Sequence, residues 1–398
     1  MGVCVKRLGE NLNRPETLIS FHLFSSWESG MIDKRLEKFA NILVHHSLGL
    51  KKNDLFVLSG SHLAAPLIKE VYTQAVEVGA HPFTHIGIDG LAEIYYRYSS
   101  ENQLKYVSPI SKFEIEHIDA SLSIISPENT RNMTNIDPKK QVMSSVAHRQ
   151  IHKIFLDRAA KKELRWCVTQ YPTQASAQDA EMSLAEYEDF IFSSAHVDAK
   201  DPIKYWRNVH TEQEKIRKLL NMKKKIHVLA KDTDLTVSVV GRKWINCSGK
   251  ENFPDGEVFT GPVENSAEGH IRYSFPGSHG GREVDDIQLW FKKGVVVKAT
   301  ASKGEKFLSS MLDMDPGARR LGEFAFGTNY GVKKYTKNTL FDEKIGGTIH
   351  LAVGSGYPET GSKNISSLHW DMMCDLRKNG EVYADNELIY KNGRFLNI

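Results

Sequence analysis

The chain has 398 residues, more than one ordinary hydrophobic core accommodates, so its length predicts two domains. Its composition, with 40% hydrophobic and 25% charged residues, is that of a soluble globular protein. A net charge of +3 is close to neutral for this length, and no apolar run reaches the ~20 residues that span a bilayer, so neither a nucleic-acid nor a membrane partner is indicated.

The first half of the chain reads as alternating helices and strands. Residues 1–30 show no clear period and no signal-peptide pattern, so we expect a disordered extension there. From residue 31 onward, short apolar runs alternate with helical patterns, which is typical of a mostly parallel sheet covered by helices on both faces. The predicted strands cover residues 55–58, 82–88, 120–125 and 166–168, and the predicted helices cover 36–44, 67–76, 138–162 and 206–220, with a further helix beginning after Ser183.

The pattern changes after the lysine run 223–225. We interpret this run as a solvated helix end, because no aromatic residues are interleaved with it. Residues 235–239 then alternate between apolar and polar side chains, and the alternation returns at 287–291, which is typical of half-buried antiparallel strands. We therefore predict an α/β domain at 31–225, followed by a sheet-rich α+β domain at 226–398 that binds metal.

Two histidine-bearing segments of the first domain invite a functional interpretation that their context does not favour. His62 lies between a strand and a helix, a position that resembles a phosphate cradle. The glycine-rich motifs of nucleotide-binding loops are absent, so we expect no organic cofactor there. His45 and His46 end a helix, where polar and cationic side chains are common.

Side chains that bind metals occur in four short segments of the second domain. They lie among Gly, Pro, Thr and aromatic residues, so turns and strands place them rather than a polar helix face. Together they supply two Glu, two His, one Asp and one Tyr, the set expected for a pair of borderline divalent ions such as Zn, Co or Mn. The residues are Glu257 in NFPDGEVFTGP, Glu323 in RLGEFAFGTN, His350 and Tyr357 in IHLAVGSGYPE, and His369 and Asp371 in SSLHWDMM.

The spacing of these residues in the sequence is by itself weak evidence for a metal site. His369 and Asp371 are two residues apart, so on a strand both point to the same face. His350 lies in an apolar, strand-like run, and Glu257 and Glu323 each follow a glycine. No local motif such as HExxH is present, and each of these side chains taken alone is as well explained as an ordinary paired polar residue.

These segments resemble the aminopeptidase T and aminopeptidase S family of PepS-like metallo-aminopeptidases. The resemblance extends from Met31 to Leu396 and rests on several motifs in one order, namely RLEKFANILV, YPTQASAQDAEMSLAEYEDF, NFPDGEVFTGP, GARRLGE, IHLAVGSGYPE and HWD. It implies an α/β N-terminal domain, a C-terminal domain that binds two divalent ions, and a homodimer around an enclosed cavity. The segment between Tyr357 and His369 is short beside some relatives, which concerns the rim of the site and not its ligands.

The resemblance also implies an activity, the release of the N-terminal residue from peptides by a water activated by two ions, which we take to be Zn, Co, Mn or Mg. We predict catalytic roles for Glu323, as the carboxylate that bridges the ions, and for Tyr357, as a metal ligand or a donor to the oxyanion. Glu359 and Asp342 are candidates to hold the free amine of the substrate. The implied metal-binding residues are Glu257, Glu323, His350, Tyr357, His369 and Asp371.

The expected partners are peptides with a free N-terminus and a second copy of the chain. The four cysteines lie far apart without a CxxC pair, which argues against a disulfide framework and predicts a cytoplasmic location. Two alternatives stay open. One is another metal-dependent amide or ester hydrolase that does not require a free N-terminus, and the other is a non-catalytic protein with a structural metal.

Overall fold

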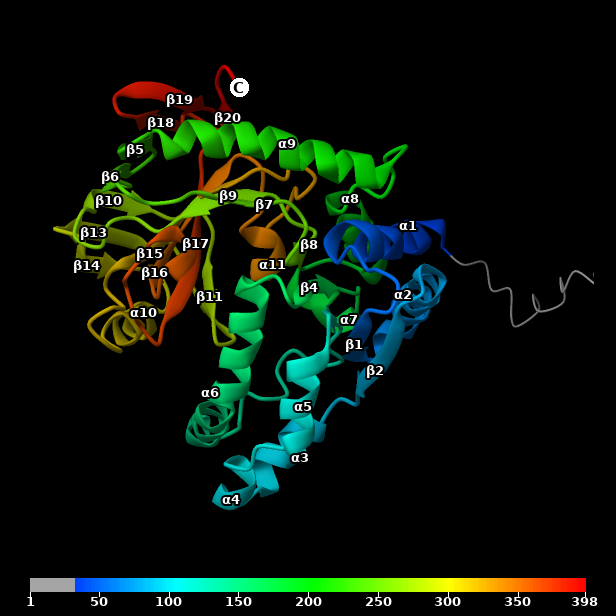
Figure 1. Ribbon diagram of the computed structural model, residues 1–398. Helices are drawn as coiled ribbons and strands as arrows, with labels where there is room; N and C mark the ends of the chain where they lie inside the picture. Colours follow the sequence, from blue (N-terminus) through cyan, green and yellow to red (C-terminus); the bar gives the residue numbers. More distant parts are fainter. Residues whose placement is uncertain (1–32) are drawn as a thin grey trace, which may run out of the picture. The chain divides into compact units, whose positions relative to one another are not determined.

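The first half of the chain folds around a five-stranded parallel sheet (Figure 1). The computed structural model describes residues 33–398, so the predicted extension at 1–30 lies outside the described residues. The strand order is β2-β1-β3-β4-β8, and every neighbouring pair is parallel. The strands are β1 Leu55–Ser61, β2 His81–Gly87, β3 Ala120–Ile125, β4 Arg165–Gln170 and β8 Asn252–Phe253.

Helices connect these strands, as parallel pairing requires. The apolar positions predicted for the first helix are buried, and the helix after β1 ends where Gly79 adopts a left-handed φ of 87°. The predicted elements of this half are confirmed, but three helices between residues 91 and 117 were not predicted. The helical segments are α1 Lys34–Ile42, η1 Leu43–Ser47, η2 His62–Ala64, α2 Ala65–Val78, α3 Leu91–Tyr98, α4 Glu101–Leu104, α5 Pro109–His117, α6 Pro138–Ala160, α7 Gln174–Asp179, α8 Leu184–Ser194 and α9 Pro202–Asn221.

The second half is built from antiparallel sheets. An eight-stranded sheet has the order β14-β13-β10-β6-β5-β18-β19-β20, and a five-stranded sheet has the order β17-β16-β15-β9-β7. A hairpin joins β11 to β12. The strands are β5 Lys225–Ala230, β6 Thr233–Ser238, β7 Ile245–Cys247, β9 Glu257–Thr260, β10 Glu268–Arg272, β11 Gly277–His279, β12 Arg282–Val284, β13 Gln288–Lys292, β14 Val295–Thr300, β15 Leu321–Gly327, β16 Thr348–Gly354, β17 His369–Asp375, β18 Glu381–Ala384, β19 Glu387–Lys391 and β20 Arg394–Phe395, and the helical segments are α10 Glu305–Leu312, α11 Thr339–Asp342 and η3 Pro358–Thr360.

The predicted fold class, an α/β part with a parallel sheet followed by a sheet-rich part, is therefore confirmed. The boundary near residue 225 stays a prediction, and β8 from beyond it pairs with β4 of the parallel sheet. None of the helices within residues 33–398 is long and apolar enough to cross a membrane.

The two large antiparallel sheets share one hydrophobic core. Leu235 and Val237 of β6 belong to the same buried cluster as Leu351 and Val353 of β16. Successive side chains of a strand point to opposite faces, so His350, next to Leu351, points away from this core. The same alternation on β9, β15 and β17 directs a second set of side chains to that outer face.

Candidate metal centre

The outer face of the five-stranded sheet carries the predicted metal ligands. Ala352 on β16 pairs with Asp371 on β17 and with Glu323 on β15, so only a methyl group separates the two carboxylate-bearing positions. His350 lies beside Ala325 on β15 in the same way. Small side chains therefore alternate with the acidic and imidazole side chains on this face of the sheet.

A β-bulge at Gly322 turns Glu323 toward this face. Leu321 lies in the core between the sheets, and a residue two positions further along a regular strand would face the same core. The register of β15 against β16 shifts between Leu321 and Glu323, which reverses the direction of Glu323. Gly322 is required because a Cβ atom there would lie 2.2 Å from the carbonyl oxygen of Ser355.

Glu323 lies between the two histidines. Its Oε1 is 3.5 Å from Nε2 of His350, and its Oε2 is 3.5 Å from Nε2 of His369. The same nitrogen of His369 is 3.1 Å from Oδ2 of Asp371, and that of His350 is 3.4 Å from Oε2 of Glu257. The five residues predicted as ligands through a carboxylate or an imidazole therefore form one connected group with Glu323 at its centre.

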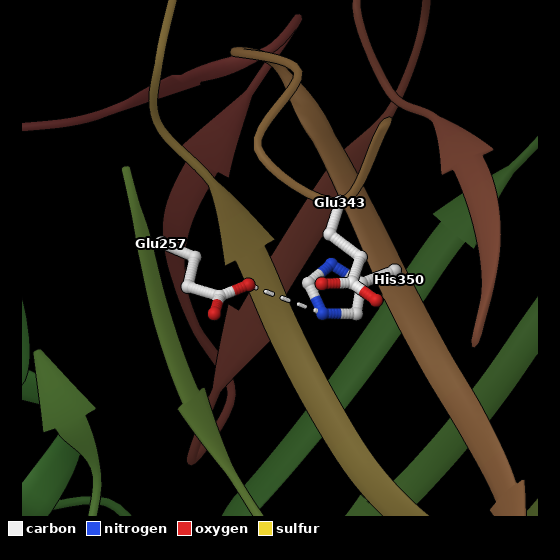
Figure 2. Close-up of side chains that lie close together, drawn as sticks. All are labelled: Glu257, Glu343 and His350. Carbon is white, nitrogen blue, oxygen red and sulfur yellow. Dashed lines mark ion pairs between the residues drawn. The ribbon is translucent and has the colours of Figure 1, made fainter. Parts of the chain in front are cut away.

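Two charged residues of this centre were not predicted from the sequence. Glu343 follows α11, and one of its oxygens lies within 4.8 Å of ligand atoms of Glu257 and His350 (Figure 2). The next residue, Lys344, is buried and contacts both carboxylates. Two adjacent charged residues after a short helix ordinarily indicate an exposed turn. Only the apolar Phe341 and Ile345 nearby in the sequence indicate that this segment is buried.

The unpaired polar atoms buried in the centre fit a divalent ion. Oε2 of Glu257, Oδ1 of Asp371 and both ring nitrogens of His350 have no hydrogen-bond partner within the described residues. Each unsatisfied buried group costs about 1–3 kcal/mol, so a group of them in a protein interior indicates a ligand that satisfies them. Carboxylate oxygens and imidazole nitrogens are ligand types that zinc-like ions take.

The charges of the centre favour a cation. Burial lowers the pKa of His350, but the adjacent carboxylates of Glu323 and Glu257 raise it to about 9. Burial likewise lowers the pKa of His369, whereas the charge of Asp371 raises it to about 12. The carboxylates thus hold protons on both imidazoles, and a divalent ion competes with those protons for the same lone pairs.

His369 and Tyr357 form the more open side of the centre. Nδ1 of His369 donates a 2.8 Å hydrogen bond to the carbonyl oxygen of Ser355, which leaves the lone pair of the neutral ring on Nε2. Tyr357, just before η3, is 39% exposed, and its ring packs edge-on against Phe259 and His369. Burial of its hydroxyl, together with the charges of Glu323 and the other carboxylates, raises the pKa of Tyr357, so the hydroxyl keeps its proton.

The remaining candidates from the sequence lie elsewhere or serve the fold. Asp342 is buried and accepts hydrogen bonds from the backbone N and Oγ1 of Thr336, at 2.7 and 2.9 Å. Glu359 is exposed in η3, beside Tyr357. His62 is exposed at the start of η2 and belongs to neither ligand group of the described chain.

The fold and these side chains define a class, an α/β protein whose second half holds a buried group of carboxylates and histidines that fits divalent ions. The family described as thermophilic metalloprotease (M29) matches residues 32–395, and the chain belongs to that family. It is 29% identical over 362 residues to Aminopeptidase 2 of Geobacillus stearothermophilus, covering 84% of this chain and 87% of the relative. It is 27% identical over 352 residues to Aminopeptidase T of Thermus thermophilus, covering 82% and 86%. The resemblance to the aminopeptidase T and S family is confirmed.

Two solved structures share the fold. Wild-type AmpT from Thermus thermophilus aligns with a TM-score of 0.79 at 24% identity, covering 91% of this chain and 99% of that one. The 2,5-dihydroxypyridine dioxygenase of Pseudomonas putida KT2440 aligns with a TM-score of 0.55 at 12% identity, covering 92% and 97%. These structural similarities establish the fold alone, so the chemistry must be argued from the site.

Proposed function

We propose that this metalloprotease is an aminopeptidase that releases the N-terminal residue of peptides with the help of two divalent ions, Zn, Co, Mn or Mg. The observation that supports this best is the buried group around Glu323, with its unpaired carboxylate and imidazole atoms. Membership of the metalloprotease family and the two relatives named as aminopeptidases support the same activity.

Each ion has its own set of protein ligands in this proposal. Glu257, His350 and Oε1 of Glu323 would hold one ion, and His369, Asp371 and Oε2 of Glu323 would hold the other. Glu323 would therefore bridge the pair. Bound divalent ions polarise a scissile carbonyl and lower the pKa of a water to near neutrality.

The residues at the open side would bind and orient the substrate. The protonated hydroxyl of Tyr357 would donate a hydrogen bond to the oxyanion that forms on the scissile carbonyl, which makes it a catalytic residue. Glu359 is the carboxylate that we assign to the free amine of the substrate, because it is exposed beside Tyr357. We do not assign that role to Asp342, which is buried and accepts two hydrogen bonds from Thr336.

The two alternatives predict different observations. A structural metal site is closed by its protein ligands, whereas the side chain of His369 is 29% exposed and Tyr357 is 39% exposed. This openness favours catalysis over a structural role. A hydrolase that does not require a free N-terminus would cleave N-acetylated and unblocked peptides equally, whereas we expect cleavage of the unblocked peptides only.

Removal of metal is expected to abolish activity. Dialysis against a chelator should stop the release of N-terminal residues from unblocked peptides, because the carboxylates and imidazoles of the centre cannot polarise a carbonyl by themselves. Added Zn, Co or Mn should restore the release, measured by the free amino acid formed. Full turnover by protein that elemental analysis shows to be free of metal would contradict the proposed mechanism.

We further propose that the protein forms a homodimer through an apolar surface on α3, α5 and α6, with α4 packed against α6 (Figure 1). Single exposed apolar side chains are ordinary, but a set this large on neighbouring helices marks an interface. The side chains of this set are Leu91, Ile94, Tyr95, Tyr98, Tyr106, Ile110, Phe113, Val142, Val146 and Leu156, each 40–77% exposed.

Charges on this surface are expected to separate the subunits. Replacement of Ile110 and Phe113, which are 75% and 64% exposed, by glutamate should convert the dimer to a folded monomer, because an unpaired carboxylate buried in an interface is costly. Sedimentation measures the mass. Val297→Glu is the matched control, since Val297 is 59% exposed on β14. A monomeric wild type, or a double variant of unchanged mass, would contradict this interface.

We also place the protein in the cytoplasm. Cys167, Cys247 and Cys374 are all free thiols in the structure, and none of them pairs with another. Burial raises the pKa of Cys167 and of Cys247 well above the usual value for a thiol, so both stay protonated. Unreactive, unpaired thiols agree with a reducing compartment.

A further inference from the structure

Lys344 is a fully buried lysine at the edge of the candidate metal centre. Its side chain is 1% exposed, and its Nζ lies 2.7 Å from Oε1 of Glu257 and 3.0 Å from Oε2 of Glu343. The backbone of Lys344 is fixed by a 2.9 Å hydrogen bond from the N–H of Asn329 to its carbonyl oxygen. A buried ammonium is tolerated only when it is paired, and these two carboxylates pair it.

The ammonium contacts only part of each carboxylate. Oε2 of Glu257 lies 3.4 Å from Nε2 of His350 and has no hydrogen-bond partner. Glu343 likewise offers an oxygen to the same group (Figure 2). Lys344 therefore contacts one oxygen of each carboxylate, and Oε2 of Glu257 is left to face Nε2 of His350.

The centre holds more carboxylates than lysine or arginine side chains to pair with them. Four carboxylates lie in it, and Lys344 is the one lysine or arginine that forms an ion pair with any of them among the described residues. Close carboxylates repel one another strongly in a poorly solvated site. The four are Glu257, Glu323, Glu343 and Asp371.

We propose that Lys344 is an internal counter-ion of the metal centre, a positioning residue that keeps Glu257 and Glu343 in place while no metal is bound. The proposal rests on the proposed function only in requiring that the centre binds divalent ions. Bound ions neutralise the same carboxylates, so the stabilising contribution of Lys344 is large in the metal-free protein and small in the loaded one. Lys344 and the metal therefore oppose each other. Bound metal reduces the stability that Lys344 contributes, and Lys344 lowers the affinity of the centre for metal.

Lys344→Met tests this antagonism through stability and metal affinity, without reference to catalysis. The variant should lower the Tm of the metal-free protein much more than the Tm of the zinc-saturated protein. By linkage, its affinity for zinc, measured by competition with a chelator, should rise by about tenfold or more. A lysine that only supports the fold would lower both Tm values equally and leave the zinc affinity unchanged.

Lys337→Met is the matched control. Lys337 also joins two carboxylates, Glu181 at 3.0 Å and Glu283 at 3.3 Å, but neither is a candidate ligand. Its replacement should lower both Tm values alike. The double variant Lys344→Met with Glu343→Gln removes one charge of each sign, so its metal-free Tm should recover most of what Lys344→Met loses.

Several results would overturn the proposal. These are equal losses of Tm with and without zinc, an unchanged or weaker zinc affinity, failure of Lys344→Met to fold even with zinc, or a double variant without recovery. Wild-type protein that binds no zinc would overturn it as well. Wild-type protein that binds zinc but releases no amino acid would contradict the proposed aminopeptidase activity alone, because none of these measurements uses turnover.

Discussion

His369→Ala is expected to lose most of its bound metal and nearly all of its activity. The imidazole offers Nε2 to the centre, 3.5 Å from Glu323 and 3.1 Å from Asp371, and alanine offers no ligand atom in its place. Removing a group that merely orients a metal ligand already costs 10–100-fold, so loss of the ligand itself should cost more than about 100-fold in affinity or activity. Metal analysis and peptide turnover of the same preparation measure both quantities.

His62→Ala provides the comparison. His62 is exposed at the start of η2 and makes no contact with the centre, so its replacement should leave metal content and turnover close to those of wild type. If His369→Ala and wild type held equal amounts of metal, His369 would not be a ligand. If His62→Ala lost as much metal as His369→Ala, the ligand set would have to extend into the first half of the chain.

Local patterns in the sequence account for the regular parts of this fold. The apolar spacing of the first helix, the stop at Gly79 and the alternation after residue 225 all depend on neighbours a few positions away. Helices α3 and α5 bury none of their side chains, although Leu91, Ile94 and Tyr95 begin an apolar stripe of helical spacing on α3. The surface that we assign to the dimer includes this stripe, which the described chain leaves exposed.

The candidate site was predictable in its residue types but not in its geometry. His369 and Asp371 share a face through their spacing alone, whereas the direction of Glu323 depends on the bulge at Gly322. That bulge arises from the pairing of β15, which ends at Gly327, with β16, which begins at Thr348, so it depends on residues that are distant in the sequence. Glu343 was missed because its burial likewise depends on distant strands. The structure brings the predicted residues together, and their roles as ligands stay predictions.

The same fold supports more than one chemistry. A structure described as a dioxygenase shares it at 12% identity, so the arrangement of sheets does not by itself select hydrolysis. The selection must come from the side chains on the outer face of the five-stranded sheet. The metal ligands among these side chains explain how ions would be bound. Hydrolysis also requires a residue at the open side that contacts the substrate.

Replacement of Tyr357 tests whether a residue at the open side of the centre takes part in catalysis. The turn before it contains Gly354, with a φ of 102°, and Gly356, where a Cβ atom would lie 2.0 Å from Oγ of Ser362. The backbone N–H of Thr360 then bonds the carbonyl oxygen of Tyr357 at 3.1 Å. This well-determined turn fixes the ring against His369, with ring centroids 5.2 Å apart.

Tyr357→Phe is expected to lower kcat by roughly 10²–10³, as the loss of one oxyanion donor does, while the fold stays intact. Phenylalanine keeps the ring and its packing on Phe259 and His369, so a tyrosine that only packs would lose about 1 kcal/mol of stability and no activity. Metal analysis separates two roles, because retention of metal identifies an oxyanion donor and loss of an ion identifies a ligand. A variant with the kcat of wild type would contradict both roles and leave Tyr357 as part of the rim.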